Sequence, residues 1–151
     1  MNRIVVEHQQ IKPEIKASER GLIAIVDDDA SLRASTLRLL RWSGLRAEAF
    51  YCAEEFLRSE FLARTACLLL DVRMPGIGGL ELQRRLAETG RRIPILFLSA
   101  RASDEEVRHA LQAGAAGFLR KPVRKEALLS AIHCILQTPT TNKDYLCGSY
   151  V

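Results

Sequence analysis

The sequence lacks the signals that mark exported, membrane-spanning and cysteine-rich metal-binding proteins. Residues 1–10 contain no basic region followed by an apolar stretch, and no apolar run is long enough to span a bilayer. Four cysteines are present, none of them in a CxxC pair or at the spacing of metal ligands: Cys52, Cys67, Cys134 and Cys147. We therefore expect reduced thiols, a cytoplasmic location and no membrane partner.

The basic residues are not gathered into one block of the chain. The 22 lysine and arginine residues outnumber the 18 acidic residues, for a net charge of +4, but the arginines are dispersed. Dispersed charge is typical of solvated helix faces and is only weak evidence for a nucleic-acid partner. We therefore expect no direct binding of nucleic acid by this chain.

The length and composition fit one globular domain. A chain of 151 residues can bury a core, and 48% hydrophobic and 26% charged residues are ordinary for such a domain. Polar segments precede the first apolar run and follow the last helical pattern. We interpret residues 1–20 as an N-terminal extension, 21–137 as the domain and 138–151 as a C-terminal tail.

Strand and helix patterns alternate five times along the domain. Short apolar runs predict strands over residues 22–27, 45–50, 66–71, 94–99 and 117–120. Helical spacing of apolar residues predicts helices over residues 29–42, 53–62, 80–88, 103–113 and 125–137. Most of the strands are apolar throughout, which is typical of a parallel sheet covered on both faces. The sequence therefore predicts an α/β fold, a five-stranded doubly wound parallel sheet flanked by five helices.

Four of the predicted strands lead directly into polar residues. Asp27 and Asp28 follow the first strand, Asp71 ends the third, Ser99 ends the fourth and Lys121 follows the fifth. In an open parallel sheet these ends gather along one edge, where binding sites form. Carboxylates packed together repel each other unless a cation binds them, and an oxygen-lined site favours Mg²⁺. The pattern suits a divalent cation together with a phosphoryl group.

A run of acidic residues can also be no more than the start of a helix. Asp29 is expected to cap the helix that follows it, and Ser103 with Glu106 has the pattern of a capping box. For Asp28 and Asp71 this structural explanation is weaker, because two carboxylates at one sheet edge are costly unless they bind something.

Asp71 could also act as a nucleophile. A carboxylate that attacks a phosphoryl group forms an aspartyl phosphate, and this transfer needs charge stabilisation more than proton movement. Mg²⁺ and Lys121 would supply that charge, and Ser99 could donate to a phosphoryl oxygen. Lys121 alone could equally be an ordinary surface lysine, but Pro122 after it indicates a fixed turn, with a cis bond as one option.

The set Asp27-Asp28, Asp71, Ser99 and Lys121-Pro122 resembles the receiver domain of bacterial response regulators, the CheY-like family, over residues 22–137. Segment 71–80, Asp-Val-Arg-Met-Pro-Gly-Ile-Gly-Gly-Leu, is especially similar to FixJ-type receivers. This resemblance implies a flavodoxin-like, CheY-like fold. It also implies a two-component response regulator that takes a phosphoryl group from a sensor histidine kinase or phosphotransfer protein and switches protein–protein interactions in signal transduction.

The resemblance also implies a role for each residue at the sheet edge. Asp71 would be the phosphoacceptor, and Lys121 would contact the phosphoryl group. Asp28 would ligate Mg²⁺ directly, Asp27 would act beside it, often through water, and the backbone carbonyl of Arg73 would be a further ligand.

Two more positions would report the state of the site to the rest of the domain. Ser99 would swing inward after phosphorylation, and Phe118 stands at the position of the switch aromatic, although simple core packing would also explain a phenylalanine there. The expected output surface comprises the helix over residues 103–113, the strand that holds Phe118 and the last helix. We also hypothesise that Arg73 and Arg101 restrict the attacking water and prolong the lifetime of the phosphoryl group.

Enzymatic alternatives fit the sequence less well. A phosphatase of the haloacid-dehalogenase type needs a second Asp two residues after its nucleophile, and Arg73 stands there instead. No G-x-G-x-x-G follows the first strand, which argues against a dinucleotide-binding domain. We therefore expect no enzyme, only self-phosphorylation and slow autodephosphorylation.

The sequence leaves two interpretations of the chain open: a stand-alone regulator, or a fragment of a longer one. FixJ-type receivers usually precede a DNA-binding domain, but residues 145–151 do not resemble the start of one, which favours a stand-alone protein that acts on a downstream protein partner. A homodimer is a further option. A scaffold-type receiver that is not phosphorylated would be expected to have lost part of the acidic set, and the set is intact.

Overall fold

Five short strands form one parallel sheet at the centre of the computed structural model, which describes residues 21–137. The strands are β1 (Leu22–Val26), β2 (Ala47–Phe50), β3 (Thr65–Leu70), β4 (Ile95–Ser99) and β5 (Gly117–Arg120). Their order in the sheet is β2-β1-β3-β4-β5, and every neighbouring pair is parallel. The chain leaves β1 toward β2 on one side and then returns to β3 on the other, so the predicted doubly wound fold is confirmed. The predicted extension and tail lie outside the described residues.

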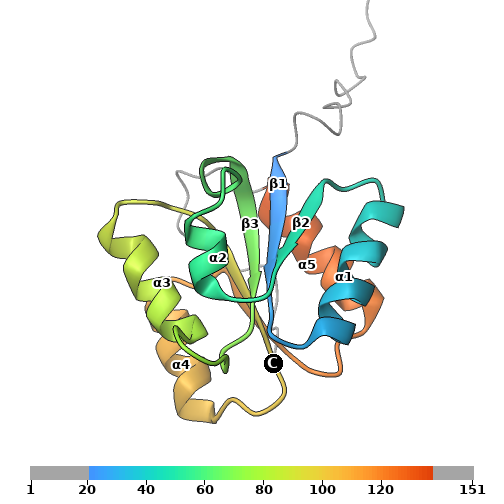
Figure 1. The fold of residues 1–151 in the computed structure, drawn as a ribbon. Coiled ribbons are helices and arrows are strands. Elements are labelled where there is room, and N and C mark those ends of the chain that lie inside the picture. The colour runs from blue at the N-terminus through green and yellow to red at the C-terminus, as the bar shows by residue number, and fades with distance from the viewer. Residues whose placement is uncertain (1–20, 138–151) are drawn as a thin grey trace, which may run out of the picture.

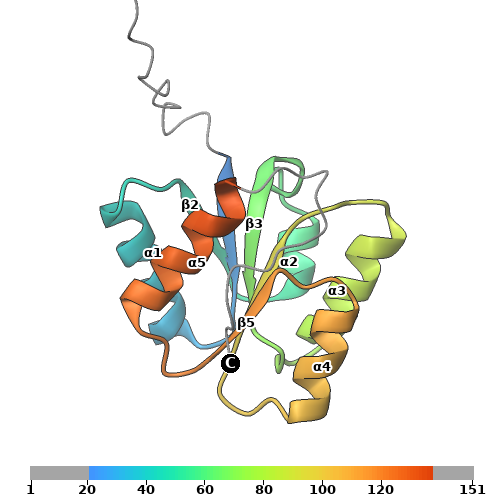
Figure 2. The ribbon, with the colours of Figure 1, turned by 180° about the vertical axis from the view of Figure 1, so that it is seen from behind.

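Helices cover both faces of the sheet. They are α1 (Ala30–Trp42), α2 (Ala53–Leu57), α3 (Gly79–Glu88), α4 (Asp104–Gln112) and α5 (Lys125–Gln137), with a short 3-10 turn, η3 (Leu62–Arg64), before β3. Figures 1 and 2 show α1 and α5 on one face and α2, α3 and α4 on the other. Within residues 21–137 no helix is long and apolar enough to cross a membrane.

The helix predicted over residues 53–62 is too long. In the structure α2 ends at Leu57, and the Ser59 hydroxyl donates to the Phe56 carbonyl at 2.8 Å. A serine side chain that bonds locally to the backbone offers the chain an alternative to continued helix. The segment therefore turns and enters η3 before the third strand.

The central strands are buried on both faces, which explains their uninterrupted apolar sequence. In β1, Ile23 and Ile25 pack with α1 and α5, whereas Ala24 and Val26 pack with α2, α3 and α4. Side chains of a strand alternate between the two faces of a sheet, so a strand covered on both sides must be apolar at every position.

Two helix starts follow the sequence expectations. The Asp29 side chain accepts hydrogen bonds from the backbone N–H groups of Ser31 and Leu32, which caps α1. The Ser103 and Glu106 side chains form the reciprocal capping box of α4. Both caps lie at the carboxyl edge of the sheet, so they fix how α1 and α4 leave that edge.

The expectation for the thiols is only partly confirmed. Cys52 and Cys67 are free, and Cys67 is buried among the aliphatic side chains of α1, α5 and the sheet. Cys134, on α5, is disulfide-bonded, so the expectation that all thiols are reduced is wrong at this residue.

Candidate functional site

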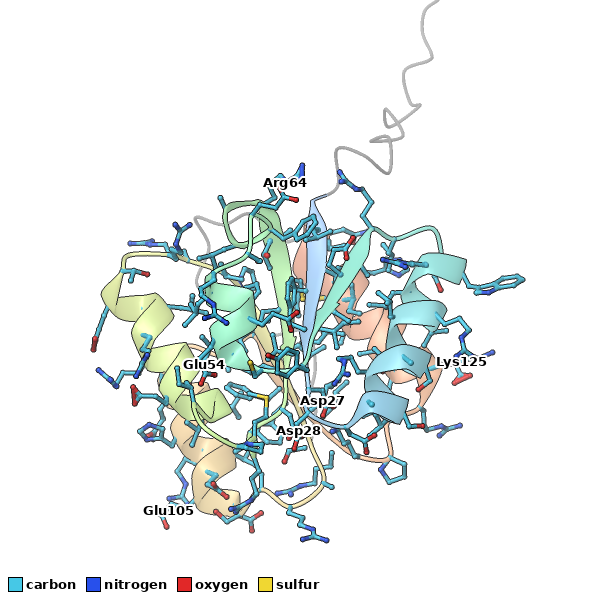
Figure 3. All side chains as sticks on the ribbon, viewed as in Figure 1. Asp27, Asp28, Glu54, Arg64, Glu105 and Lys125 are labelled. Atoms are coloured by element: carbon cyan, nitrogen blue, oxygen red, sulfur yellow. The ribbon has the colours of Figure 1, made fainter. Side chains whose placement is uncertain are left out.

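Three carboxylates meet where β1 and β3 end. Carboxylate oxygens of Asp27, Asp28 and Asp71, one from each residue, all lie within 4.8 Å of one another. Figure 3 shows Asp27 and Asp28 at the lower end of β1, the carboxyl edge of the sheet. The strand order places β1 and β3 side by side, so their ends deliver these residues to one point, as the sequence predicts.

Lys121 reaches this cluster from the end of β5. Its ammonium nitrogen, Nζ, lies 2.8 Å from Asp27 Oδ2 and 3.2 Å from Asp71 Oδ2. All three side chains are nearly buried, at 8–12% exposure. The lysine is therefore not an ordinary surface residue but the counter-charge of two buried carboxylates. The Lys121–Pro122 peptide bond that follows is cis.

Burial and neighbouring charges shift the pKa values of this group. Burial raises the pKa of Asp71 and the charge of Asp27 adds to the rise, whereas Lys121 and the Arg73 N–H partly offset it. Burial alone would lower the pKa of Lys121, but the hydrogen bonds and charges of Asp27 and Asp71 together outweigh it and raise that pKa. The lysine therefore stays protonated, and it brings a fixed positive charge to the acidic cluster.

The donor set fits a hard divalent cation. Three carboxylates that each offer one oxygen leave room for waters and a further oxygen ligand, which is the coordination that Mg²⁺ prefers. Arg73 lies beside the cluster, where its backbone N–H donates to Asp71 Oδ1 at 3.3 Å. The expected role of its carbonyl as a ligand stays a prediction.

Two features of the site were missed at the sequence level. The guanidinium of Arg33, on α1, donates to the Asp27 carbonyl at 2.7 Å and so holds the turn that carries Asp27 and Asp28. Helical side chains lean toward the N-terminus of their helix, so the place of Arg33 one turn after the Asp29 cap was a usable signal.

Gly79 is the other missed feature. A Cβ atom on this residue would lie only 2.2 Å from the Asp71 carbonyl oxygen, and the Gly79 N–H donates to the Val72 carbonyl at 2.9 Å. The first turn of α3 therefore packs directly against the backbone of Asp71, which only a glycine permits. In the sequence the Gly-Gly pair indicated no more than a loop.

Ser99 and Phe118 both point into the protein in this structure. Ser99 is 1% exposed at the end of β4, and its carbonyl accepts from the Lys121 N–H at 2.9 Å. Phe118 is also 1% exposed, and its ring stacks on Phe97 with centroids 5.7 Å apart and planes 21° apart. Core packing therefore accounts for the position of Phe118 in this structure, and its role as a switch stays a prediction.

Comparisons with known proteins agree with this geometry. The family model of the response regulator receiver domain matches residues 23–133. The response regulator protein TmoT of Ectopseudomonas mendocina is 40% identical over 126 residues, which cover 83% of this chain and 57% of TmoT. Nodulation protein W of Bradyrhizobium diazoefficiens is 40% identical over 117 residues, which cover 78% of this chain and 52% of that protein. The chain thus spans about half the length of the curated relatives it matches.

Solved structures of receivers have the same fold. The response regulator StyR aligns with a TM-score of 0.71 and 42% identity, over 77% of this chain and 59% of StyR. FixJ-N aligns with a TM-score of 0.72 and 28% identity, over 79% of this chain and 95% of that structure.

Proposed function

Because the chain belongs to the family of response regulator receiver domains, we propose that Asp71 accepts a phosphoryl group from a sensor histidine kinase or a phosphotransfer protein. The observation that carries the proposal is the contact of Lys121 Nζ with Asp27 and Asp71 inside the acidic cluster. A buried cation beside three carboxylates suits a group that arrives with its own negative charge. Modification of Asp71 then changes the protein contacts of the domain.

The transfer is a displacement at phosphorus. A carboxylate oxygen of Asp71 attacks, the new bond joins that oxygen to phosphorus, and the bond from phosphorus to the donor breaks. The electron pair of the broken bond stays with the donor, a histidine nitrogen or the oxygen of acetyl phosphate. Lys121 stabilises the charge on the phosphoryl oxygens, and Ser99 donates a hydrogen bond to one of them.

Asp27, Asp28 and Asp71, with the Arg73 carbonyl, are the residues that would hold Mg²⁺. A bound Mg²⁺ ion supplies positive charge to the phosphoryl oxygens. The chain itself orients the ligands: Arg33 fixes the Asp27 carbonyl at 2.7 Å, and Gly79 lets α3 close against Asp71. The transfer itself needs no general acid or base. We propose that the chemistry comprises self-phosphorylation and slow autodephosphorylation rather than enzymatic turnover.

The output follows from the elements that leave the site. Ser99 begins the connection to α4, and Phe118 lies on β5, the strand paired with β4, where its ring stacks on Phe97. A change at Ser99 and Phe118 alters the surface of α4, β5 and α5, where a downstream protein or a second copy of the chain binds. The location that suits a sensor-kinase partner is the cytoplasm.

A second role is favoured by the lengths of the relatives. The chain spans about half of TmoT, and a further relative that is 38% identical is named the transcriptional regulatory protein TdiR of Thauera aromatica. The domain would then be the receiver part of a longer regulator that binds DNA elsewhere. An intact acidic set argues against the alternative of a scaffold that is never phosphorylated.

Intact-mass spectrometry tests the phosphoacceptor directly. The protein is incubated with acetyl phosphate and Mg²⁺, beside Asp71→Ala and a sample treated with a chelator. A single phosphoryl adduct that both controls lose supports the proposal. An adduct that persists in Asp71→Ala, or none in the wild type, would refute it.

A further inference from the structure

Two arginines hold the connection between β4 and α4 from opposite sides. The Arg73 guanidinium, from the loop after β3, donates to the Arg101 carbonyl at 3.3 Å and to Glu106 Oε1 at 2.7 Å. The Arg120 guanidinium, from the end of β5, donates to the Ala102 carbonyl at 2.8 Å and to Asp104 Oδ1 at 3.0 Å. Each arginine therefore binds one loop carbonyl and one carboxylate in the first turn of α4.

Glu106 has two functions at one atom. Its Oε1 accepts both the Arg73 guanidinium at 2.7 Å and the Ser103 backbone N–H at 3.0 Å. The carboxylate that caps α4 is therefore also the counter-charge of a residue in the loop that carries Asp71. Through this one atom the start of α4 is tied to that loop.

The two arginines differ in their distance along the chain from Asp71. Arg73 is two residues after it, and its own N–H donates to Asp71 Oδ1 at 3.3 Å. Arg120 contacts only the β4–α4 connection and α4, according to the hydrogen bonds of the described residues. A new anion on Asp71 would therefore compete for Arg73 before it competes for Arg120.

We infer that Arg73 is a latch: it holds the start of α4 through Glu106 while Asp71 is unmodified, and it leaves Glu106 for an anionic phosphoryl group on Asp71. This inference deepens the proposed function and rests on it. Arg73 can change partner because its ion pair with Glu106 is weak. The two side chains are 57% and 26% exposed, and an exposed ion pair favours its bound form by only about 1.4- to 5-fold. A phosphoryl group brings nearly two negative charges and three acceptor oxygens.

Release of the latch has a defined structural consequence. The Arg101 carbonyl loses its donor, whereas Arg120 still holds Ala102 and Gln83 Nε2 still donates to the Ala110 carbonyl at 3.0 Å, near the end of α4. The capping box survives because Ser103 continues to donate to Glu106. The first turn of α4 and residues 100–103 gain freedom, and the far end of the helix stays in place.

The test uses beryllium fluoride with Mg²⁺, a non-covalent mimic of the phosphoryl group. Glu106→Gln removes the charge that binds Arg73, and glutamine at this position still completes a capping box. Glu105→Gln is the matched control, because Glu105 lies in the same first turn and is exposed. Binding of the mimic is measured by fluorine NMR titration, and exchange of the amides of residues 100–106 is followed by mass spectrometry.

We expect Glu106→Gln to bind the mimic about two- to five-fold more tightly than the wild type, and Glu105→Gln to match the wild type. In Glu106→Gln the amides of residues 100–106 should exchange, before any mimic is added, at the rate that the wild type reaches only when loaded. Arg73→Ala should show the same fast exchange but weaker binding, since it removes the cation as well as the latch.

Equal binding and equal exchange in the wild type and both glutamine variants would overturn the latch while leaving Asp71 as the acceptor. Failure of the wild type to bind the mimic at all would instead refute the proposed function, and the latch with it.

Discussion

The two faces of the sheet are packed with different kinds of side chain. The face under α2, α3 and α4, here called the aromatic face, buries four phenylalanines: Phe50, Phe56, Phe97 and Phe118. The face under α1 and α5, here called the aliphatic face, contains no aromatic ring among the described core residues and is filled by Ile, Leu, Ala and Cys67. Rings on the aromatic face form pairs, with centroids 5.4 Å apart for Phe50–Phe56 and 5.7 Å for Phe97–Phe118.

Each site residue can be assigned to one of these faces by the helix that follows it in the chain. Asp28 leads into α1 and Lys121 leads toward α5, both on the aliphatic face. Asp71 leads into α3 and Ser99 leads into α4, both on the aromatic face. The candidate metal ligand Asp28 and the cation Lys121 thus lead into helices of one face, whereas the proposed acceptor Asp71 and Ser99 lead into helices of the other. We therefore expect the core of the aliphatic face to support the site, and the core of the aromatic face to respond first, before the change reaches the outer surface of α5.

The largest expected effect is on the aliphatic face. Ile132, on α5, is fully buried there, and Ile132→Ala should lower the free energy of unfolding by about 2–5 kcal/mol through lost contacts and a cavity. The folded fraction should still form the adduct at Asp71 at the wild-type rate. Urea denaturation followed by circular dichroism, with intact-mass kinetics on the same sample, measures both. Slower adduct formation in folded protein would break the division between the faces.

Gly79→Ala should lower the stability less than Ile132→Ala does, but it should slow phosphoryl adduct formation more. The added Cβ would overlap the Asp71 carbonyl oxygen, 2.2 Å away, and should cost about 1–3 kcal/mol. Displacement of Asp71 should slow adduct formation on the order of 10- to 100-fold.

Gly78→Ala is the matched control, since its Cβ would lie 3.3 Å from the Val72 carbonyl oxygen and its backbone is extended. The same urea and intact-mass measurements apply to both variants. Similar adduct rates in the two would show that α3 does not position Asp71.

The parts of the fold and site that depend on regular spacing could be predicted from the sequence. In a parallel sheet the carboxyl ends of the strands lie at one edge, so the strand pattern was enough to place Asp27, Asp28, Asp71 and Lys121 together. The receiver fold is likewise confirmed. The caps at Asp29 and Ser103 were also predictable, because a cap involves residues only two or three apart in the sequence.

Contacts between residues far apart in the chain could not be predicted in this way. The arginines at 73 and 120 reach α4 through long side chains, whose partners depend on rotamers and on how the loops cross. The close approach of Gly79 to Asp71 depends on where α3 docks, and the disulfide at Cys134 has no local signal. The inward position of Phe118 is likewise a property of packing against Phe97.

Cys67 provides a pH-dependent test of the aliphatic face. Burial raises the pKa of this thiol from 9.0 to about 12, so the folded state holds its proton more tightly than the unfolded state. The stabilisation is fully present below about pH 9 and is lost as the pH rises toward 12, because only the unfolded chain can then ionise the thiol.

Between about pH 8 and about pH 10, the wild type should lose about 1.4 kcal/mol more stability than Cys67→Ala. Urea denaturation of both proteins under reducing conditions at the two pH values gives this difference. Parallel losses in the two proteins would mean that water reaches the aliphatic face.

The smallest effect is expected from the buried hydrogen bond that joins two helices of the aromatic face. Gln83, on α3, is 5% exposed, and its Nε2 donates to the Ala110 carbonyl on α4 at 3.0 Å. That carbonyl also accepts the Ala115 N–H at 3.0 Å, so Gln83→Met removes one bond without leaving the oxygen alone. The cost should be about 0.5–1.5 kcal/mol, whereas Gln112→Met, an exposed glutamine on α4, should change little.

The pattern of amide exchange shows whether this hydrogen bond anchors α4 or only adds to the overall stability. If Gln83 anchors the far end of α4, amides of residues 107–113 should exchange faster in Gln83→Met, while those of α5 keep their wild-type protection. Equal acceleration in α4 and α5 would show that the two faces unfold together and that the bond has no anchoring role. Faster exchange confined to α4 would show that the aromatic face has a weaker unit of its own, held by one hydrogen bond at its end and by Arg73 and Arg120 at its start.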